Sequence, residues 1–321
     1  MKTLSLSRFI FTAVLLGGLT RAAIACDSCA LYLAEGADRP GFTLAVAEQF
    51  TRMGSVWSGS QHLGNPVDQY LESSTTQVTL GWSRGGPWHV QFTLPYISRR
   101  YLRPDHALIE TGRERGLGDA TLAGRYQVAK FTSARGDEFV FNVVGGVEFG
   151  TGDAEHLGDE IGEPEHHHAD FPDSGVHGHD LALGSGSTDW LLGADARWTH
   201  GRLFVQGSLQ QKLNRPGKFD YRLADETSWE VGAGGHVVLT HAHSLAVQAL
   251  VSEDHKGLDT LAGDEQEDTG SSVRYLGARV SGSLGQRFTA NASLEIPVRI
   301  RTSETMVVPD YRLRAAANWR F

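Results

Sequence analysis

Apolar and polar residues alternate strictly at the C-terminal end of the chain. From Tyr311 to Phe321 every second residue is apolar, and arginine, asparagine or alanine lies between. The same alternation runs from Phe288 to Ile300, where Thr, Asn, Ser, Glu, Pro and Arg occupy the intervening positions. A period of two residues predicts β-strands with one apolar face and one polar face.

These alternating segments are too long for an ordinary soluble sheet, whose strands usually span about 5–6 residues. Long strands with an apolar and a charged face are typical of a barrel whose outside meets lipid and whose inside meets water. Every backbone polar group in lipid must be paired, so the sheet has to close on itself. We predict an all-β fold, a closed antiparallel transmembrane β-barrel with about twelve strands, at residues 41–56, 68–83, 86–101, 118–131, 138–150, 187–200, 202–214, 227–240, 243–252, 272–284, 286–302 and 309–321.

The connections between the predicted strands alternate in length. Only one to six residues separate the strands at 84–85, 132–137, Gly201, 241–242 and Gly285, whereas long segments occupy 57–67, 102–117, 151–186, 215–226 and 253–271. Outer-membrane barrels have short periplasmic turns and longer extracellular loops. We therefore expect both chain ends in the periplasm and localisation in the bacterial outer membrane. The terminal Phe321 is typical of barrels delivered to the barrel assembly machinery.

The N-terminal residues have the composition of a secretory signal. Lys2 and Arg8 precede the apolar stretch 9–19, and Ala23-Ile24-Ala25 is a cleavage site of the small-x-small type. We expect residues 1–25 to be a signal peptide, 26–40 a periplasmic N-terminal segment and 41–321 the barrel. The net charge of −9 makes nucleic acid an unsuitable partner.

Several short motifs resemble those of one known family. Residues 116–122 (GLGDATL) with Arg125-Tyr126, residues 94–96 (LPY) and residues 184–189 (GSGSTD) resemble the signature of the barrel family named after the meta-pathway of phenol degradation. The resemblance spans residues 40–321 and implies an outer-membrane transporter for a small molecule. The family has no established catalytic residues. The chain departs from the related hydrocarbon channels because Cys-Asp-Ser-Cys, rather than an apolar plug segment, follows the predicted signal.

Cys26 and Cys29 are the only cysteines and are spaced C-x-x-C. In an oxidising compartment they predict a small disulfide, a metal-binding pair or a redox pair that meets a periplasmic partner. Cys26 is alternatively a lipid acceptor, because it follows the cleavage site directly.

The segment 151–186 concentrates histidine among acidic residues. Imidazole nitrogens suit zinc or copper, and the H-H-H and H-x-H spacings place several donors near one another. We predict that this extracellular loop captures a zinc or copper ion; the alternative is a solvated acidic loop without a ligand. No other cofactor is required. The six histidines are His156, His166, His167, His168, His177 and His179.

Charged residues occupy the predicted inward positions. They brace the barrel wall or line a polar path for a solute. A further acidic group, from Glu253 to Asp268, is expected at the extracellular mouth, where it would concentrate cations. The predicted lumen-lining residues are Glu148, Asp195, Arg197, Glu230, His236, Glu295, Arg299, Arg301, Arg312 and Arg314.

The sequence contains no nucleophile elbow, phosphate loop or H-E-x-x-H motif, so we expect no enzyme. Two functions remain. One is a channel for a small solute, with a transition-metal ion or its complex as one candidate. The other is a non-conducting barrel that binds metal at the surface or docks a periplasmic partner through the Cys26 segment.

Overall fold

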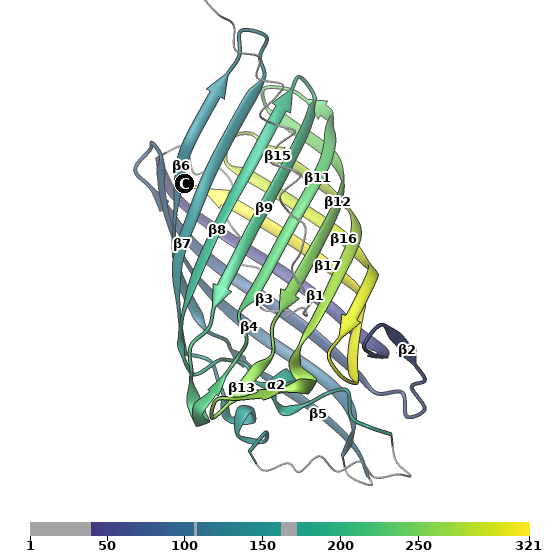
Figure 1. The fold of residues 1–321 in the computed structure, drawn as a ribbon. Coiled ribbons are helices and arrows are strands. Elements are labelled where there is room, and N and C mark those ends of the chain that lie inside the picture. Colours follow the sequence, from purple (N-terminus) through teal and green to yellow (C-terminus); the bar gives the residue numbers. More distant parts are fainter. Residues whose placement is uncertain (1–39, 106–107, 162–171) are drawn as a thin grey trace, which may run out of the picture.

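The computed structural model describes residues 40–105, 108–161 and 172–321. They form a closed antiparallel barrel of twelve long strands, in which the last strand pairs with the first (Figure 1). The predicted fold class is therefore confirmed. The wall strands are β1 (Gly41–Ser58), β3 (Tyr70–Ser83), β4 (Trp88–Asp105), β6 (Ala120–Thr132), β7 (Glu138–Phe149), β8 (Thr188–His200), β9 (Leu203–Leu213), β11 (Glu226–Leu239), β12 (His243–Lys256), β15 (Ser271–Leu284), β16 (Phe288–Thr302) and β17 (Met306–Arg320).

Side chains on each strand alternate between the lumen and the exterior. On β3, Thr75, Gln77 and Thr79 are buried in the barrel, whereas Val78 and Leu80 are exposed by 43% and 59%. Exposed apolar side chains on a single-chain barrel match a lipid environment, because lipid tails replace water around them. The alternation seen in the sequence is thus the boundary between lipid and lumen.

Exposed aromatic side chains gather near the end of the barrel that carries the short turns. The Trp88 ring lies 4.5 Å from the Tyr126 ring, and the Phe288 ring lies 5.9 Å from the Trp319 ring, measured between centroids. Aromatic rings of this kind form girdles at the membrane surface, where an apolar ring with a polar edge is stable.

The two ends of the barrel differ in their connections. Figure 1 shows short turns between neighbouring strands in the upper part of the view and longer connections, with α2 (Gly178–Leu181) and β13 (Asp259–Leu261), at the lower end. By the rule for outer-membrane barrels, the long-loop end faces the cell exterior. No helix among the described residues is long and apolar enough to span a bilayer.

Several segments predicted as plain loops contain strands. β5 (Leu108–Leu117) pairs with the outer half of β4, from Tyr96↔Leu117 to Asp105↔Leu108, so the segment 102–117 is mostly a β-hairpin. β2 (Gln61–Leu63) pairs with β1, and a small separate sheet joins the fourth and fifth long loops. That sheet consists of β10 (Tyr221–Arg222), β13 and β14 (Asp264–Gln266). These pairings satisfy backbone groups that would otherwise need water.

An arginine on the lipid face should destabilise the barrel. Val78→Arg places a charge on the exposed face near the middle of β3, and we expect a loss of about 2–4 kcal/mol in the free energy of unfolding. Urea titration of the barrel refolded in lipid vesicles, followed by tryptophan fluorescence, measures the change. Val78→Leu is the matched control and should leave stability unchanged; equal stability of Val78→Arg would contradict a lipid-facing position.

Candidate functional site: the barrel lumen and its plug

A polar cavity of about 470 Å³ occupies the middle of the lumen. Its walls carry carboxylates, guanidinium groups and amides from most strands of the barrel. Charged pairs bridge strands that are not direct neighbours: Arg125 on β6 binds Asp195 on β8, and Arg279 on β15 binds Glu230 on β11 with two bonds of 2.6 Å. Asn142 on the intervening β7 donates to Asp195 at 3.0 Å. These pairs brace the wall across the strand between them.

Arg312 is the centre of a second, deeply buried group of charges, with 1% of the residue exposed. Its guanidinium donates to Glu295, which is fully buried, at 2.6 Å and also binds Asp254 on β12. The Tyr275 ring lies 4.0 Å from the guanidinium carbon, and Arg314 lies 3.2 Å from the second oxygen of Glu295. Removing such charges from water is costly, so each needs several partners to remain ionised.

Two smaller spaces continue from the central cavity towards the long-loop end. The first, of about 10 Å³, shares Gln49, Gln210 and Asp254 with the central cavity. The second, of about 100 Å³, shares Lys212 and Glu226 with the first. The three spaces therefore lie in series along the lumen, and charged side chains fill the narrow stretch between them.

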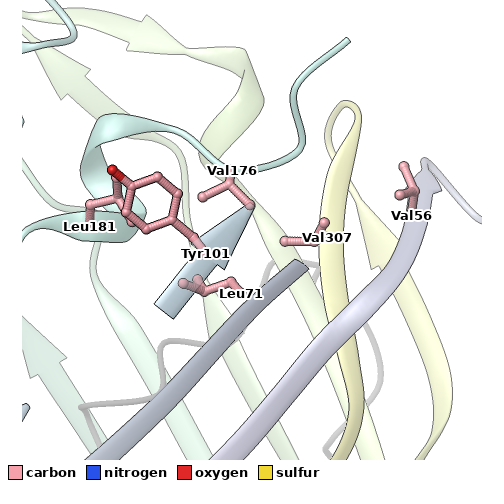
Figure 2. Close-up of a cluster of buried hydrophobic side chains, with 6 residues drawn as sticks. All are labelled: Val56, Leu71, Tyr101, Val176, Leu181 and Val307. Atoms are coloured by element: carbon pink, nitrogen blue, oxygen red, sulfur yellow. The ribbon is translucent and has the colours of Figure 1, made fainter. Parts of the chain in front are cut away.

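The outer end of this series is covered by a plug, which we define as residues 151–161 and 172–186. Each leg of the segment between β7 and β8 folds over and into the barrel mouth. Figure 2 shows Val176 and Leu181 of the plug among side chains of the inner wall. This buried apolar cluster comprises Val56, Leu71, Tyr101, Val176, Leu181 and Val307.

The second buried cluster joins the two legs of the plug to a neighbouring loop. Leu157, from the 3₁₀ helix η1 (Glu155–Gly158), packs with Ala154, Ala182 and Tyr221 of β10. Burial of these side chains accounts for the closed position of the plug, since apolar contacts with the wall exclude water from its underside.

Asp119 anchors the plug at its base. This residue follows Gly118 at the break between β5 and β6, and its carboxylate faces the plug. Gly152 donates its N–H to one oxygen at 2.7 Å, and Ser185 donates its N–H and hydroxyl to the other at 2.7 and 2.8 Å. Hydrogen bonds to an ionised acceptor are among the stronger ones in proteins. The carboxylate thus joins the two legs of the plug to one point of the wall.

The motif 184–189 supplies the second half of this anchor. Ser187 donates its hydroxyl to one oxygen of Asp189 at 2.7 Å, and the Ser185 hydroxyl oxygen lies 3.0 Å from the other. Glycine is required where the legs cross, because a Cβ on Gly184 would lie 2.7 Å from the Cα of Gly152. The GLGD and GSGSTD motifs therefore have a common structural role, which is to hold the two ends of the long loop together.

The predicted histidine cluster is divided by the structure. His177 and His179 lie together with Asp268, whose segment belongs to the fifth long loop. His156 lies apart from them, 2.8 Å from Asp159 and 3.4 Å from Glu114. The other predicted ligands, His166, His167, His168, Cys26 and Cys29, and the signal peptide lie outside the described residues.

Carboxylates surround the His179 imidazole. Burial disfavours its charged form, but Asp180 and Glu160 outweigh this effect and raise the pKa of His179 to about 9. In the same way, burial alone would raise the pKa of Glu160, whereas the imidazolium of His179 and its hydrogen bonds lower it to about 2. The pair therefore forms an internal ion pair beneath the plug surface.

Most predicted lumen residues point inward. Glu148 binds Lys212 of β9. The Arg197 guanidinium lies over the Phe204 ring, 4.4 Å from its centroid. The His236 ring centroid lies 5.5 Å from the same centroid. The cross-strand pairs and the Arg312 network described above contain five more of them: Asp195, Glu230, Glu295, Arg312 and Arg314.

The inward positions predicted for Arg299 and Arg301 are wrong. The pairing of β15 with β16 shifts at a bulge around Val298. Beyond it, Ile300 lies opposite the fully buried Val273 and shares its inward side, so the two arginines point outward and are exposed. A bulge inserts one residue and reverses which side chains face the lumen.

The acidic group predicted at the extracellular mouth is only partly located there. β12 continues to Lys256, four residues beyond the predicted end at 252, so Glu253 and Asp254 lie in the wall rather than in a loop. Asp254 faces the lumen and binds Arg312, whereas Glu253 binds Arg274 at 2.6 Å. Only the residues from 264 onward remain at the mouth.

Four charged partners in the lumen were not among the predicted site residues: Arg125, Lys212, Asp254 and Arg279. Each occupies an inward position of its strand, so the same alternation could have identified them. What the sequence did not contain is the pairing itself, because each partner lies on a different strand.

Comparison with known proteins agrees with the fold. A crystal structure of an outer membrane channel from Pseudomonas putida F1 superposes with a TM-score of 0.61 at 15% identity, over 88% of this chain and 96% of that one. The β domain of the Bordetella autotransporter BrkA has a TM-score of 0.47 at 12% identity, over 88% and 100%. No protein-family model and no curated protein matches the chain.

The closed sheet, its apolar exterior and its aromatic girdle define a bacterial outer-membrane β-barrel. Its interior differs from a simple pore, because charged pairs cross the lumen and a folded loop covers one end.

Loss of the Asp119 carboxylate should release the plug. Asp119→Ala leaves three donors without their acceptor, and we expect a loss of about 1–3 kcal/mol for the plug in its closed position. Hydrogen exchange of the backbone amides of Gly152 and Ser185, compared with wild type, reports the change. Asp137→Ala, in the short turn between β6 and β7, is the control; faster exchange in both variants alike would contradict the anchoring role.

Glu295→Ala should destabilise the whole barrel. It leaves Arg312 buried with one carboxylate fewer, and loss of one partner of a buried pair costs about 3–5 kcal/mol. Urea titration in vesicles measures the difference. Glu138→Ala, which breaks the exposed pair with Lys130, should change stability by less than about 1 kcal/mol. Equal effects of the two variants would show that the Arg312 network is unimportant for stability.

Proposed function

We propose that the protein is an outer-membrane channel for a small polar or charged solute. The observation that carries this proposal is the central cavity of about 470 Å³, whose lining contains guanidinium, carboxylate and amide groups from several strands. Rings of charged and amide groups supply partners that replace the hydration shell of a polar solute.

The plug is the gate of this channel. In the closed position its apolar side chains fill the extracellular mouth, and Asp119 and Asp189 hold both of its ends. Both ends of the plug continue directly into wall strands β7 and β8, so opening requires the plug to move away from the wall rather than to leave the barrel. A solute would then meet the narrow stretch between Lys212 and Arg312.

The resemblance to the family named after the meta-pathway of phenol degradation supports transport of a small molecule. The motifs that carry this resemblance lie at the anchor of the plug, around Asp119 and Asp189. Membership in that family is part of the proposal. A shared anchor motif would mean that the family shares this closed arrangement of the long loop.

A non-conducting barrel is the second candidate function. It is favoured by the complete burial of Val176, Leu181 and Leu157, which makes the closed mouth tightly packed. Such a barrel would bind a metal at its surface or dock a periplasmic partner through the segment that contains Cys26 and Cys29.

Single-channel conductance in a planar bilayer separates the two candidates. For a gated channel we expect rare, brief openings in the wild-type protein and more frequent openings in Asp119→Ala, because the anchor is lost. Arg314→Gln removes a positive charge from the central cavity and should shift the ion preference towards cations. Asp137→Ala should behave as wild type. If neither wild type nor Asp119→Ala conducts, the channel proposal is wrong and the non-conducting barrel is favoured.

A further inference from the structure

Three side chains from two different loops converge beside the plug. His177 precedes α2, His179 lies within it, and Asp268 lies in the 3₁₀ helix η3 (Glu267–Thr269) of the fifth long loop. One donor atom from each lies within 4.8 Å of the other two, and Nε2 of His177 is 3.6 Å from a carboxylate oxygen of Asp268. The two imidazole rings are stacked with their centroids 5.5 Å apart.

The His179 ring is oriented by a carboxylate behind it. Glu160 contacts Nδ1 at 3.0 Å and accepts the backbone N–H of the same residue at 2.7 Å. The other ring nitrogen, Nε2, is buried and makes no hydrogen bond within the described residues, although only 2% of the His179 side chain is exposed. A buried ring nitrogen without a hydrogen bond is costly, and metal-binding histidines are commonly held by a carboxylate on the far nitrogen.

We propose that His177, His179 and Asp268 bind a divalent transition-metal ion of the zinc or copper class. Two imidazole nitrogens and one carboxylate oxygen form a donor set that these ions prefer to calcium or magnesium. Bonds of about 2.1 Å in a tetrahedral site place the donors about 3.4 Å apart, so the donors need to approach one another by roughly an ångström.

The fourth position of the site has a neighbour on the same helix. Asp180 places a carboxylate oxygen 3.5 Å from Nε2 of His179, so either this carboxylate or a water completes the coordination. The nearby Lys256 ammonium is bound to the buried Asp259 at 2.8 Å, and the carboxylates of Glu160, Asp180 and Asp268 outnumber it around the donors. The surroundings of the donors are therefore anionic.

A metal at this position joins the plug to a second loop. α2 belongs to the plug, whereas Asp268 belongs to another loop, between β14 and β15. The bound ion would add a link across the closed mouth and keep the plug in place. This effect on conductance rests on the proposed channel, whereas binding of the ion does not.

Copper binding to the full-length refolded barrel tests the site directly. Electron paramagnetic resonance of the one-to-one Cu²⁺ complex should show two coordinating nitrogens in wild type and one in His177→Ala. Zn²⁺ titration calorimetry should show a loss of affinity of about tenfold or more in Asp268→Asn, and of about 10–100-fold in Glu160→Gln, which releases the His179 ring. The controls are His156→Ala and Asp264→Asn, which keep the three ligands and should bind as wild type.

The possible results of these experiments distinguish the metal site from the proposed channel. Unchanged copper spectra and zinc affinity in both His177→Ala and Asp268→Asn would overturn the proposal. Loss of binding only after replacement of His166, His167 and His168 would overturn it as well. Zinc binding at the three ligands in a barrel that never conducts would support the metal site and contradict the channel.

Discussion

The requirement that every backbone polar group in lipid be hydrogen-bonded determines this structure. An open sheet edge in the membrane would leave a row of unpaired N–H and C=O groups, each costing several kcal/mol. The pairing of β17 with β1 removes both edges at once. Once the sheet is closed, one face of each strand must meet lipid and the other must fill the lumen, and the composition of both faces follows from this.

The lumen of a twelve-stranded barrel is narrow, so charged side chains that enter it lose much of their contact with water. The structure compensates by pairing them across intervening strands, as in Arg125–Asp195, Arg279–Glu230 and the Arg312 network. The same pairs stabilise the wall and create a polar interior. In the proposed channel, stability and the path for a solute therefore depend on the same residues, and a passing solute would exchange some of these contacts for its own.

The plug adds a second set of contacts at the extracellular mouth. Apolar contacts of Val176 and Leu181 hold its body, whereas the carboxylate of Asp119 holds its ends. The first kind of contact is not directional, and the second depends on geometry. A loop held in both ways has a defined closed position that loss of a single anchor can weaken, which is the behaviour expected of a gate.

The sequence alone determined the strands, their faces and the orientation of the loops, because the two-residue period and the loop lengths are local properties of the chain. It also drew attention to the motifs that contain Asp119 and Asp189 and to the histidine-rich segment that contains His177 and His179. It did not reveal the bulge that turns Arg299 outward, since one inserted residue leaves the local pattern almost unchanged. Only the tertiary structure brought Asp268 beside His179 and Asp254 beside Arg312, because these contacts depend on how distant strands and loops meet when the barrel closes.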